Sequence, residues 1–243
     1  MLSKSLRRLA WVALPLLGLA APAPAQDPGA VPATLKPVPR EGAGMKMHES
    51  FLERTKQGEV GLLFLGDSIT QAWSGPGKET WNRFYAPRKA ANFGIGGDRT
   101  EHILWRLDNG EVDGISPKVV VLMIGTNNSG DNSADEIAAG VKAIVAKLHD
   151  KLPKAKILLL GVFPRADRPE PIPSKLKAVN EQIAKLDDGG KTVKFLDIGG
   201  KFLEADGTLT KQMMPDLLHL SPKAYRIWAD AIEPTLFPML EAG

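Results

Sequence analysis

Runs of apolar residues divide the chain into segments typical of buried β-strands. Three of these runs are apolar apart from glycine: Val60 to Leu65, Val119 to Ile124 and Ile157 to Val162. Val193 to Leu196 is a weaker run, and Ala90 to Phe93 is a candidate for a short strand. The longer runs do not alternate with polar residues, and strands of that kind lie in parallel sheets whose two faces are both covered.

The segment from Ser133 to Leu152 has the periodicity of an amphipathic helix. Its apolar residues recur at spacings that place them on one helix face. These residues are Ile137, Val141, Ile144, Val145 and Leu148. Ser133 and Glu136 have the spacing of a capping box, and Pro153 follows the predicted C-terminal end.

A last helix is predicted from Pro222 to Leu240. Ser221 is a favourable N-cap, and proline is favourable at the first helical position. Pro234 and Pro238 lack the N–H that a helix interior needs, so we expect them to break this helix near its end.

Strands that alternate with amphipathic helices predict an α/β fold with a parallel sheet covered on both faces. In such sheets, ligands bind outside the carboxyl ends of the strands. The polar residues that follow the predicted strands are therefore the candidates for chemistry.

The composition is that of an ordinary globular protein of 243 residues, with 43% hydrophobic and 24% charged residues. This length fits one α/β domain with a leader, or at most two small domains. The formal net charge of +3 is too small to indicate nucleic-acid binding. The chain has no cysteine, which excludes disulfides, thiolate metal sites and a cysteine nucleophile.

The N-terminus has the three parts of a secretory signal peptide. Lys4, Arg7 and Arg8 form a basic region. The apolar run from Leu9 to Ala21 is about 13 residues long, which is shorter than the roughly 20 residues that span a bilayer. Ala23-Pro24-Ala25 matches a cleavage site, so we expect cleavage after Ala25 and a secreted or periplasmic protein. An uncleaved membrane anchor is the alternative.

The chain is thus expected to have three parts. Residues 1–25 are the signal peptide, residues 26–44 are a flexible N-terminal segment rich in proline, glycine and alanine, and residues 45–243 are one globular domain. No segment after the leader is apolar enough to predict a stable membrane span.

Ser68 stands just past the first predicted strand, in Leu65-Gly66-Asp67-Ser68. If a helix begins there, its free N–H groups and its dipole favour a negative charge that develops beside the serine. A nucleophilic serine and a serine that only caps the helix fit these residues equally well.

Glycine and asparagine follow two other predicted strands, in the stretches NFGIGGD at 92–98 and GTNN at 125–128. Gly97 can present an N–H to a small oxyanion, and an asparagine side chain can be a further donor. Either stretch alone is more typical of a turn, because both residue types favour turns.

His219 is the histidine best placed to act as a base. It follows Asp216 by three residues in a predicted loop, where the carboxylate can orient the imidazole and stabilise the imidazolium. His48, His102 and His149 lie on helical patterns with charged neighbours, so we expect them at a surface or interface. Together, the four motifs supply the nucleophile, base, orienting carboxylate and oxyanion donors of a serine hydrolase.

The four motifs resemble the sequence blocks of the SGNH (GDSL-type) hydrolases. The matching stretches are GDSI at 66–69, NFGIGGD at 92–98, GTNN at 125–128 and DLLH at 216–219. The stretch between Asn92 and Asn128 is most similar to the catalytic subunits of platelet-activating factor acetylhydrolase IB and their bacterial relatives. The resemblance covers essentially the whole predicted domain.

The resemblance implies a flavodoxin-like three-layer α/β/α sandwich with a five-stranded parallel sheet. It implies Ser68 as the nucleophile, His219 as the general base and Asp216 as the residue that orients the base. It also implies an oxyanion hole formed by the N–H groups of Ser68 and Gly97 and the side chain of Asn127. No metal and no organic cofactor are implied.

Together with the predicted signal peptide, the resemblance implies a secreted esterase acting on short-chain, acetyl-type carboxylic esters. The expected partner is a small-molecule or glycan ester, and the resemblance also implies a homodimer. A lysophospholipase or thioesterase on the same fold, or a non-catalytic carbohydrate-binding protein, are the alternatives. Trp73, Trp81 and Trp105 are candidates for a pocket wall, although core packing is the expected role of each.

Overall fold

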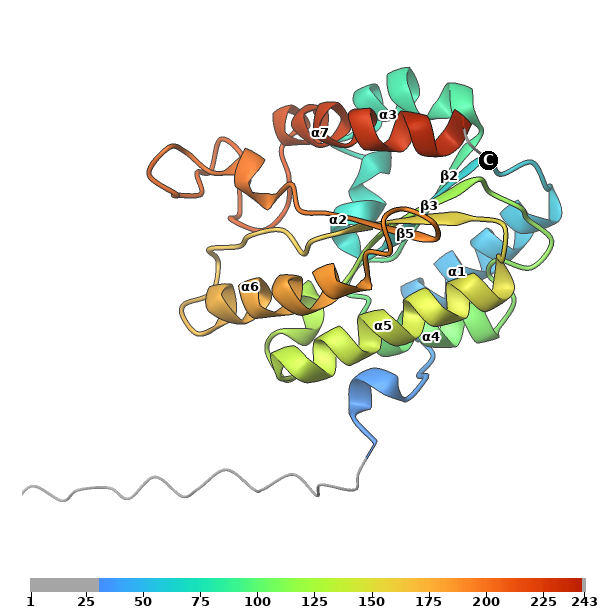
Figure 1. The fold of residues 1–243 in the computed structure, drawn as a ribbon, viewed down its shortest axis with the longest axis horizontal. Helices are drawn as coiled ribbons and strands as arrows, with labels where there is room; N and C mark the ends of the chain where they lie inside the picture. Colours follow the sequence, from blue (N-terminus) through green and yellow to red (C-terminus); the bar gives the residue numbers. More distant parts are fainter. Residues whose placement is uncertain (1–30, 242–243) are drawn as a thin grey trace, which may run out of the picture. The chain divides into compact units, whose positions relative to one another are not determined.

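The computed structural model describes residues 31–241, which contain a parallel sheet between two layers of helices (Figure 1). The strands are β1 (Leu62–Gly66), β2 (Ala90–Gly94), β3 (Val119–Met123), β4 (Lys156–Leu160) and β5 (Val193–Leu196). Their order in the sheet is β2-β1-β3-β4-β5, and every neighbouring pair is parallel. This is the flavodoxin-like order, in which the chain reverses direction across the sheet between β1 and β3. The predicted fold class is confirmed.

The helices divide between the two faces of the sheet (Figure 1). One layer contains α1 (Ala43–Lys56), α4 (Thr100–Asp108), α5 (Ala134–Lys151) and α6 (Ile172–Ile183). The other layer contains α2 (Ser68–Gln71), α3 (Lys78–Phe84) and α7 (Pro222–Glu241). The short 3-10 helices are η1 (Ala33–Leu35), η2 (Ala72–Ser74), η3 (Ala86–Arg88), η4 (Thr126–Asn128), η5 (Ala184–Leu186) and η6 (Gly199–Phe202).

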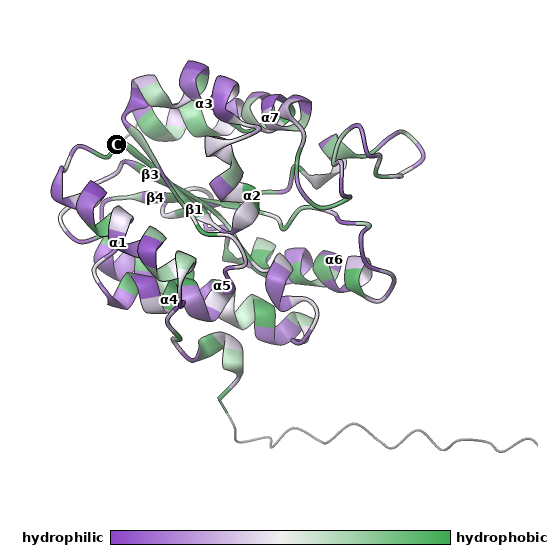
Figure 2. Ribbon diagram, turned by 180° about the vertical axis from the view of Figure 1, so that it is seen from behind, coloured by the Kyte–Doolittle hydropathy of each residue, from purple (hydrophilic) through white to green (hydrophobic). Residues whose placement is uncertain are grey.

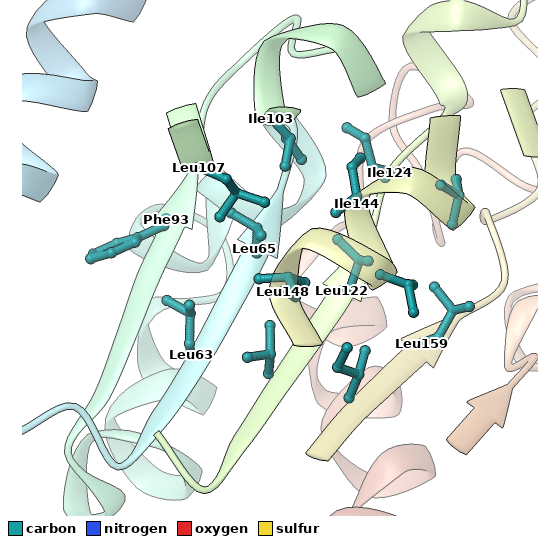
Figure 3. Close-up of a cluster of buried hydrophobic side chains, with 14 of the residues drawn as sticks. Leu63, Leu65, Phe93, Ile103, Leu107, Leu122, Ile124, Ile144, Leu148 and Leu159 are labelled. Carbon is teal, nitrogen blue, oxygen red and sulfur yellow. The ribbon is translucent and has the colours of Figure 1, made fainter. Parts of the chain in front are cut away.

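The strands are apolar on both faces because each face packs against its own helix layer. Leu63 and Leu65 of β1 face the cluster built with α1, α4, α5 and α6. Figure 3 shows the part of this cluster that α4 and α5 form with the strands. Leu62 and Phe64 face the cluster built with α2, α3 and α7. Side chains of a strand alternate between the two faces, so unbroken apolar runs are needed here. The same pattern is visible as hydrophobic colouring along the central strands in Figure 2.

Helix α5 begins at the predicted capping box. The backbone N–H of Ser133 donates to the Glu136 carboxylate at 2.8 Å, and the backbone N–H of Glu136 donates to the Ser133 hydroxyl at 3.2 Å. The helix ends at Lys151, two residues before Pro153. Periodicity and capping therefore predicted this helix to within one residue at each end.

The structure corrects the prediction that prolines break the last helix. Helix α7 continues through Pro234 and Pro238 to Glu241. Both prolines are exposed, whereas Leu236 and Met239 are buried against the sheet. Asp230 and Pro234, whose carbonyls lose a helical partner at these prolines, are exposed residues, and the buried side chains hold the helix in place.

The structure describes residues 31–44 of the segment that we expected to be flexible, and these residues contact the domain. The Thr34 hydroxyl is buried and donates to the Glu136 carbonyl at 2.7 Å. The Val38 N–H donates to the Glu101 carbonyl at 3.2 Å. Composition does not reveal such contacts, because the partners lie far away in the sequence. The predicted signal peptide and residues 26–30 lie outside the described residues.

Across residues 31–241, no helix has both the length and the apolar character needed to cross a membrane.

The course of α7 predicts the effect of replacing its first internal proline. Pro234→Ala restores a helical N–H at an exposed site, and we expect it to raise the free energy of unfolding by about 1–2 kcal/mol in urea denaturation. Pro222→Ala is the matched control, because Pro222 occupies the first helical turn, where proline is favourable. A loss of stability in Pro234→Ala would contradict an unbroken α7.

Candidate active site

The register of the sheet brings three loops together at its carboxyl end. Gly66 at the end of β1 pairs with Gly94 of β2 and with Met123 of β3. Residues 67–68 follow β1, residues 95–98 follow β2 and η4 follows β3. We call residues 95–98 the glycine loop. Three of the four motifs found in the sequence are therefore neighbours in space.

Ser68 is the first residue of α2, directly after β1. The Asp67 carboxyl group caps this short helix by accepting a hydrogen bond from the Ile69 N–H at 2.9 Å. Helix α2 packs so closely on β2 that a Cβ at Gly94 would clash with the backbone of Thr70 and Gln71. Glycine at the end of β2 thus lets the serine helix lie against the neighbouring strand.

Ser68, His219 and Asp216 form a continuous hydrogen-bonded chain. The Ser68 Oγ lies 2.9 Å from Nε2 of His219, and Nδ1 of His219 lies 2.6 Å from Oδ2 of Asp216. When Nδ1 carries the proton and donates it to the carboxylate, Nε2 is free to accept the serine proton. The geometry is that of a nucleophile, a base and a group that orients the base.

Asp216 is held in its ionised form by its surroundings. Desolvation raises the pKa of Asp216, but hydrogen bonds from the His219 ring and from the backbone N–H groups of His219 and Leu218 outweigh it. The pKa falls to about 2. Asp216 therefore remains a carboxylate that can stabilise a positive charge on His219 near neutral pH.

The expected oxyanion donors lie on the segments that leave β1, β2 and β3 at the carboxyl end of the sheet. Gly97 has a φ of +77°, which favours glycine, and none of the hydrogen bonds among residues 31–241 is donated by the Gly97 N–H or the Ser68 N–H. The Asn127 Nδ2 donates to the Asp98 carbonyl at 2.8 Å and has a second hydrogen to offer. Each of the three groups therefore has a hydrogen that it can donate to a developing oxyanion.

A buried network of charged residues lies behind the glycine loop, and sequence reasoning missed it. The Arg106 guanidinium pairs with Asp98 at 2.8 Å and with Glu111, and it donates to the Phe93 carbonyl at 3.2 Å. All three charged side chains are buried. Arg106 lies three residues after Ile103, on the apolar face of α4. An arginine at such a position could have indicated a buried charge in the sequence.

The structure also corrects the expected position of one histidine. His48 is buried rather than at a surface, and its Nδ1 lies 3.0 Å from the Glu111 carboxylate. His102 is half-buried, and its Nδ1 accepts a hydrogen bond from the Arg99 N–H at 3.0 Å. The charged neighbours of His48 in the sequence did not reveal this buried partner, which lies 63 residues further along the chain. Trp73 is fully buried among aromatic side chains, so its expected role in core packing is confirmed.

A polar cleft of about 480 Å³ adjoins Asn127. Its charged wall comes from Asp131, Arg165, Arg168 and Glu170. Arg165 donates to the Thr126 carbonyl at 3.1 Å and to both carboxylate oxygens of Asp167, so its charge is already compensated. A bound ester would therefore find charged and hydrogen-bonding groups next to the expected oxyanion hole.

No cluster of three or more potential metal ligands of the His, Cys, Asp or Glu type occurs within residues 31–241.

Asp67 is a buried carboxyl group directly beside the nucleophile. Desolvation is the largest influence and raises the pKa of Asp67 to about 7, with the Ile69 N–H opposing the shift and the charge of Asp98 adding to it. Within the described part of the chain, Oδ2 of Asp67 has no hydrogen-bond partner.

This raised pKa predicts a pH-dependent cost in stability. Between about pH 4 and pH 7, the folded protein holds a proton on Asp67 that the unfolded chain has released, so stability falls as the pH rises. Asp67→Asn removes this loss. We expect the free energy of unfolding of Asp67→Asn, measured relative to the wild type in urea, to rise by about 2 kcal/mol from pH 5 to pH 8. Asp206→Asn is the control, because hydrogen bonds from Thr208 lower the pKa of the exposed Asp206 carboxyl group. An unchanged difference between pH 5 and pH 8 would contradict a buried, protonated Asp67.

Comparison with known proteins identifies the family of this chain. The profile of the GDSL-like lipase/acylhydrolase family matches residues 64–227. Human platelet-activating factor acetylhydrolase IB subunit alpha1 is 37% identical over 215 residues, which are 88% of this chain and 92% of that protein.

Two solved structures share the fold. A GDSL-like lipase from Bacteroides thetaiotaomicron is 19% identical, with a TM-score of 0.65 over 81% of this chain and 98% of that one. A carbohydrate acetylesterase from Sinorhizobium meliloti is also 19% identical, with a TM-score of 0.56 over 74% of this chain and 100% of that one. The family match and the human relative together show that this chain belongs to the GDSL-like lipase/acylhydrolase family.

Proposed function

We propose that this protein is a serine esterase that hydrolyses short-chain, acetyl-type esters of a hydrophilic alcohol. The observation that carries the proposal is the hydrogen-bonded chain from Ser68 through His219 to Asp216, with distances of 2.9 and 2.6 Å. The family match supports ester hydrolysis as the reaction class.

In the proposed reaction, the Ser68 oxygen attacks the ester carbonyl as His219 takes the serine proton. The carbonyl oxygen becomes an oxyanion, which accepts hydrogen bonds from the N–H groups of Ser68 and Gly97 and from Asn127. His219 then gives its proton to the leaving alcohol, and an acyl group remains on Ser68. A water molecule, deprotonated by His219, attacks this acyl-enzyme, and the acid leaves as the serine proton returns.

The cleft beside Asn127 supports a hydrophilic alcohol as the leaving group. Its wall carries Asp131, Arg168 and Glu170, which offer hydrogen-bond donors and acceptors to hydroxyl groups. The Sinorhizobium meliloti neighbour, which shares the fold, is named a carbohydrate acetylesterase, and its name therefore describes an acetyl ester of a hydrophilic alcohol. An acetylated carbohydrate is therefore the substrate class we favour.

A lipid ester is the second candidate. The human relative is named for platelet-activating factor, and it matches 88% of this chain. A lysophospholipid or a long-chain thioester would need an apolar surface near Ser68, in contrast to the charged wall of the cleft.

Hydrolysis of p-nitrophenyl acetate, butyrate and decanoate distinguishes these proposals. We expect wild-type activity to fall steeply with acyl length, and Ser68→Ala to lower kcat by about 10⁴-fold or more because the nucleophile is lost. Activity that rises with acyl length would favour a lipid or thioester substrate. Folded wild type that hydrolyses none of these esters above the Ser68→Ala background would contradict the esterase proposal.

A variant of Arg168 tests the alcohol half of the proposed substrate. We expect Arg168→Ala to raise KM about tenfold for an acetylated oligosaccharide, since a hydrogen bond to a charged group contributes about 1.5–3 kcal/mol, while kinetics on p-nitrophenyl acetate stay unchanged. Arg226→Ala is the matched control, because Arg226 is an exposed arginine on α7 paired with Asp230. Equal effects of the two variants on KM would contradict binding of the alcohol half in the cleft.

A further inference from the structure

Arg40 reaches from the N-terminal segment onto the glycine loop. Its Nη2 donates to the Gly96 carbonyl at 3.2 Å, and its Nη1 donates to the Gly97 carbonyl at 3.2 Å. Its Nε lies 3.7 Å from Oδ1 of Asp98. One guanidinium group therefore contacts three consecutive residues that lie more than fifty positions further along the chain.

The surrounding chain holds Arg40 in this place. The Val38 N–H donates to the Glu101 carbonyl at 3.2 Å, which fixes the segment before Arg40 on helix α4. A Cβ at Gly44 would lie 2.8 Å from the Arg40 Cβ and 3.0 Å from its Nε, so glycine in the first turn of α1 makes room for the arginine stem. The Arg40 side chain is 29% exposed, and solvent reaches part of it.

The contact with Gly96 acts on the amide group that contains the Gly97 N–H. The Gly96 carbonyl and the Gly97 N–H belong to one planar peptide unit and point in opposite directions. A donor that binds the carbonyl therefore fixes the direction of the N–H. It also polarises the amide, which makes the N–H a stronger donor.

Other contacts anchor the glycine loop, but the hydrogen bond to the Gly96 carbonyl comes from Arg40. The Gly96 N–H donates to Gln71 Oε1 at 2.7 Å, and the Asp98 carbonyl accepts from Asn127. The peptide between two glycines can rotate easily, because neither residue has a Cβ that limits its backbone angles. A bond to the Gly96 carbonyl prevents that rotation.

We propose that Arg40 is a positioning residue of the oxyanion hole, which aims and polarises the Gly97 N–H through the Gly96 carbonyl. The inference rests on the proposed esterase function, because it assigns the Gly97 N–H to the developing oxyanion. The positive charge also lies 3.7 Å from Asp98, where it adds to the charge of Arg106 in offsetting this buried carboxylate.

Steady-state kinetics of Arg40→Ala on p-nitrophenyl acetate test this inference. Removing an oxyanion donor outright costs about 10²–10³ in kcat, and we expect the weakened donor to lower kcat at least about tenfold with little change in KM. Arg40→Lys keeps the charge but cannot contact both carbonyls in the same way, and we expect an intermediate kcat.

Arg54→Ala is the matched control. Arg54 donates to the carbonyls of Gly58 at 2.7 Å and Glu59 at 3.4 Å, so it also binds two consecutive carbonyls, but before the start of β1. We expect Arg54→Ala to change thermal stability and to leave kcat unchanged. Added guanidinium should restore part of kcat in Arg40→Ala, because the vacated site is partly open to solvent, and should not affect Arg54→Ala.

The possible outcomes separate this inference from the esterase proposal. If the wild type is active, two results would overturn the role of Arg40 alone. The first is an unchanged kcat in folded Arg40→Ala. The second is a loss in kcat that guanidinium does not restore and that Arg54→Ala shares. A wild type without esterase activity above the Ser68→Ala background would overturn both.

Discussion

The parallel, in-register pairing of β1 with β2 and β3 determines where the nucleophile and the expected oxyanion donors lie. Gly66 is level with Gly94 on one side and with Met123 on the other. The serine helix, the glycine loop and Asn127 all leave the sheet at this level, so they meet without a long loop. A shift in either pairing would separate the nucleophile from its oxyanion donors.

Buried charge then fixes the glycine loop within this frame. Asp98 and Glu111 lie on either side of Arg106, and Arg40 approaches Asp98 from the surface. Removing one member of a buried ion pair costs about 3–5 kcal/mol, because the remaining charge is left without a partner. The loop that carries Gly97 is thus held more firmly than its glycine content would indicate.

The sequence predicted the features that depend on local pattern. The strands, the capping box at Ser133 and the motifs around Ser68 and His219 follow from periodicity, helix capping and spacing. The course of α7 through Pro234 depends instead on the burial of Leu236 and Met239, which the proline rule ignores. His48 depends on a partner 63 residues away, and periodicity holds no information about such a partner.

In the candidate site, too, some features follow from local sequence and others depend on distant contacts. The types of residue needed for a serine hydrolase are visible in the motifs, and the family match covers them. The contacts that aim these residues, such as Arg40 on Gly96 and Arg106 on Asp98, come from segments that no motif joins. Sequence therefore indicates the chemistry, while the tertiary structure supplies its positioning.

Mass spectrometry of the protein after reaction with a fluorophosphonate tests the central claim most directly, because this reagent modifies a serine only when a base activates it. The account predicts one adduct, located on Ser68 by peptide mapping, that forms far more slowly in His219→Ala. Retained ester hydrolysis without an adduct on Ser68, or an adduct on Ser68 that forms equally fast in His219→Ala, would contradict it.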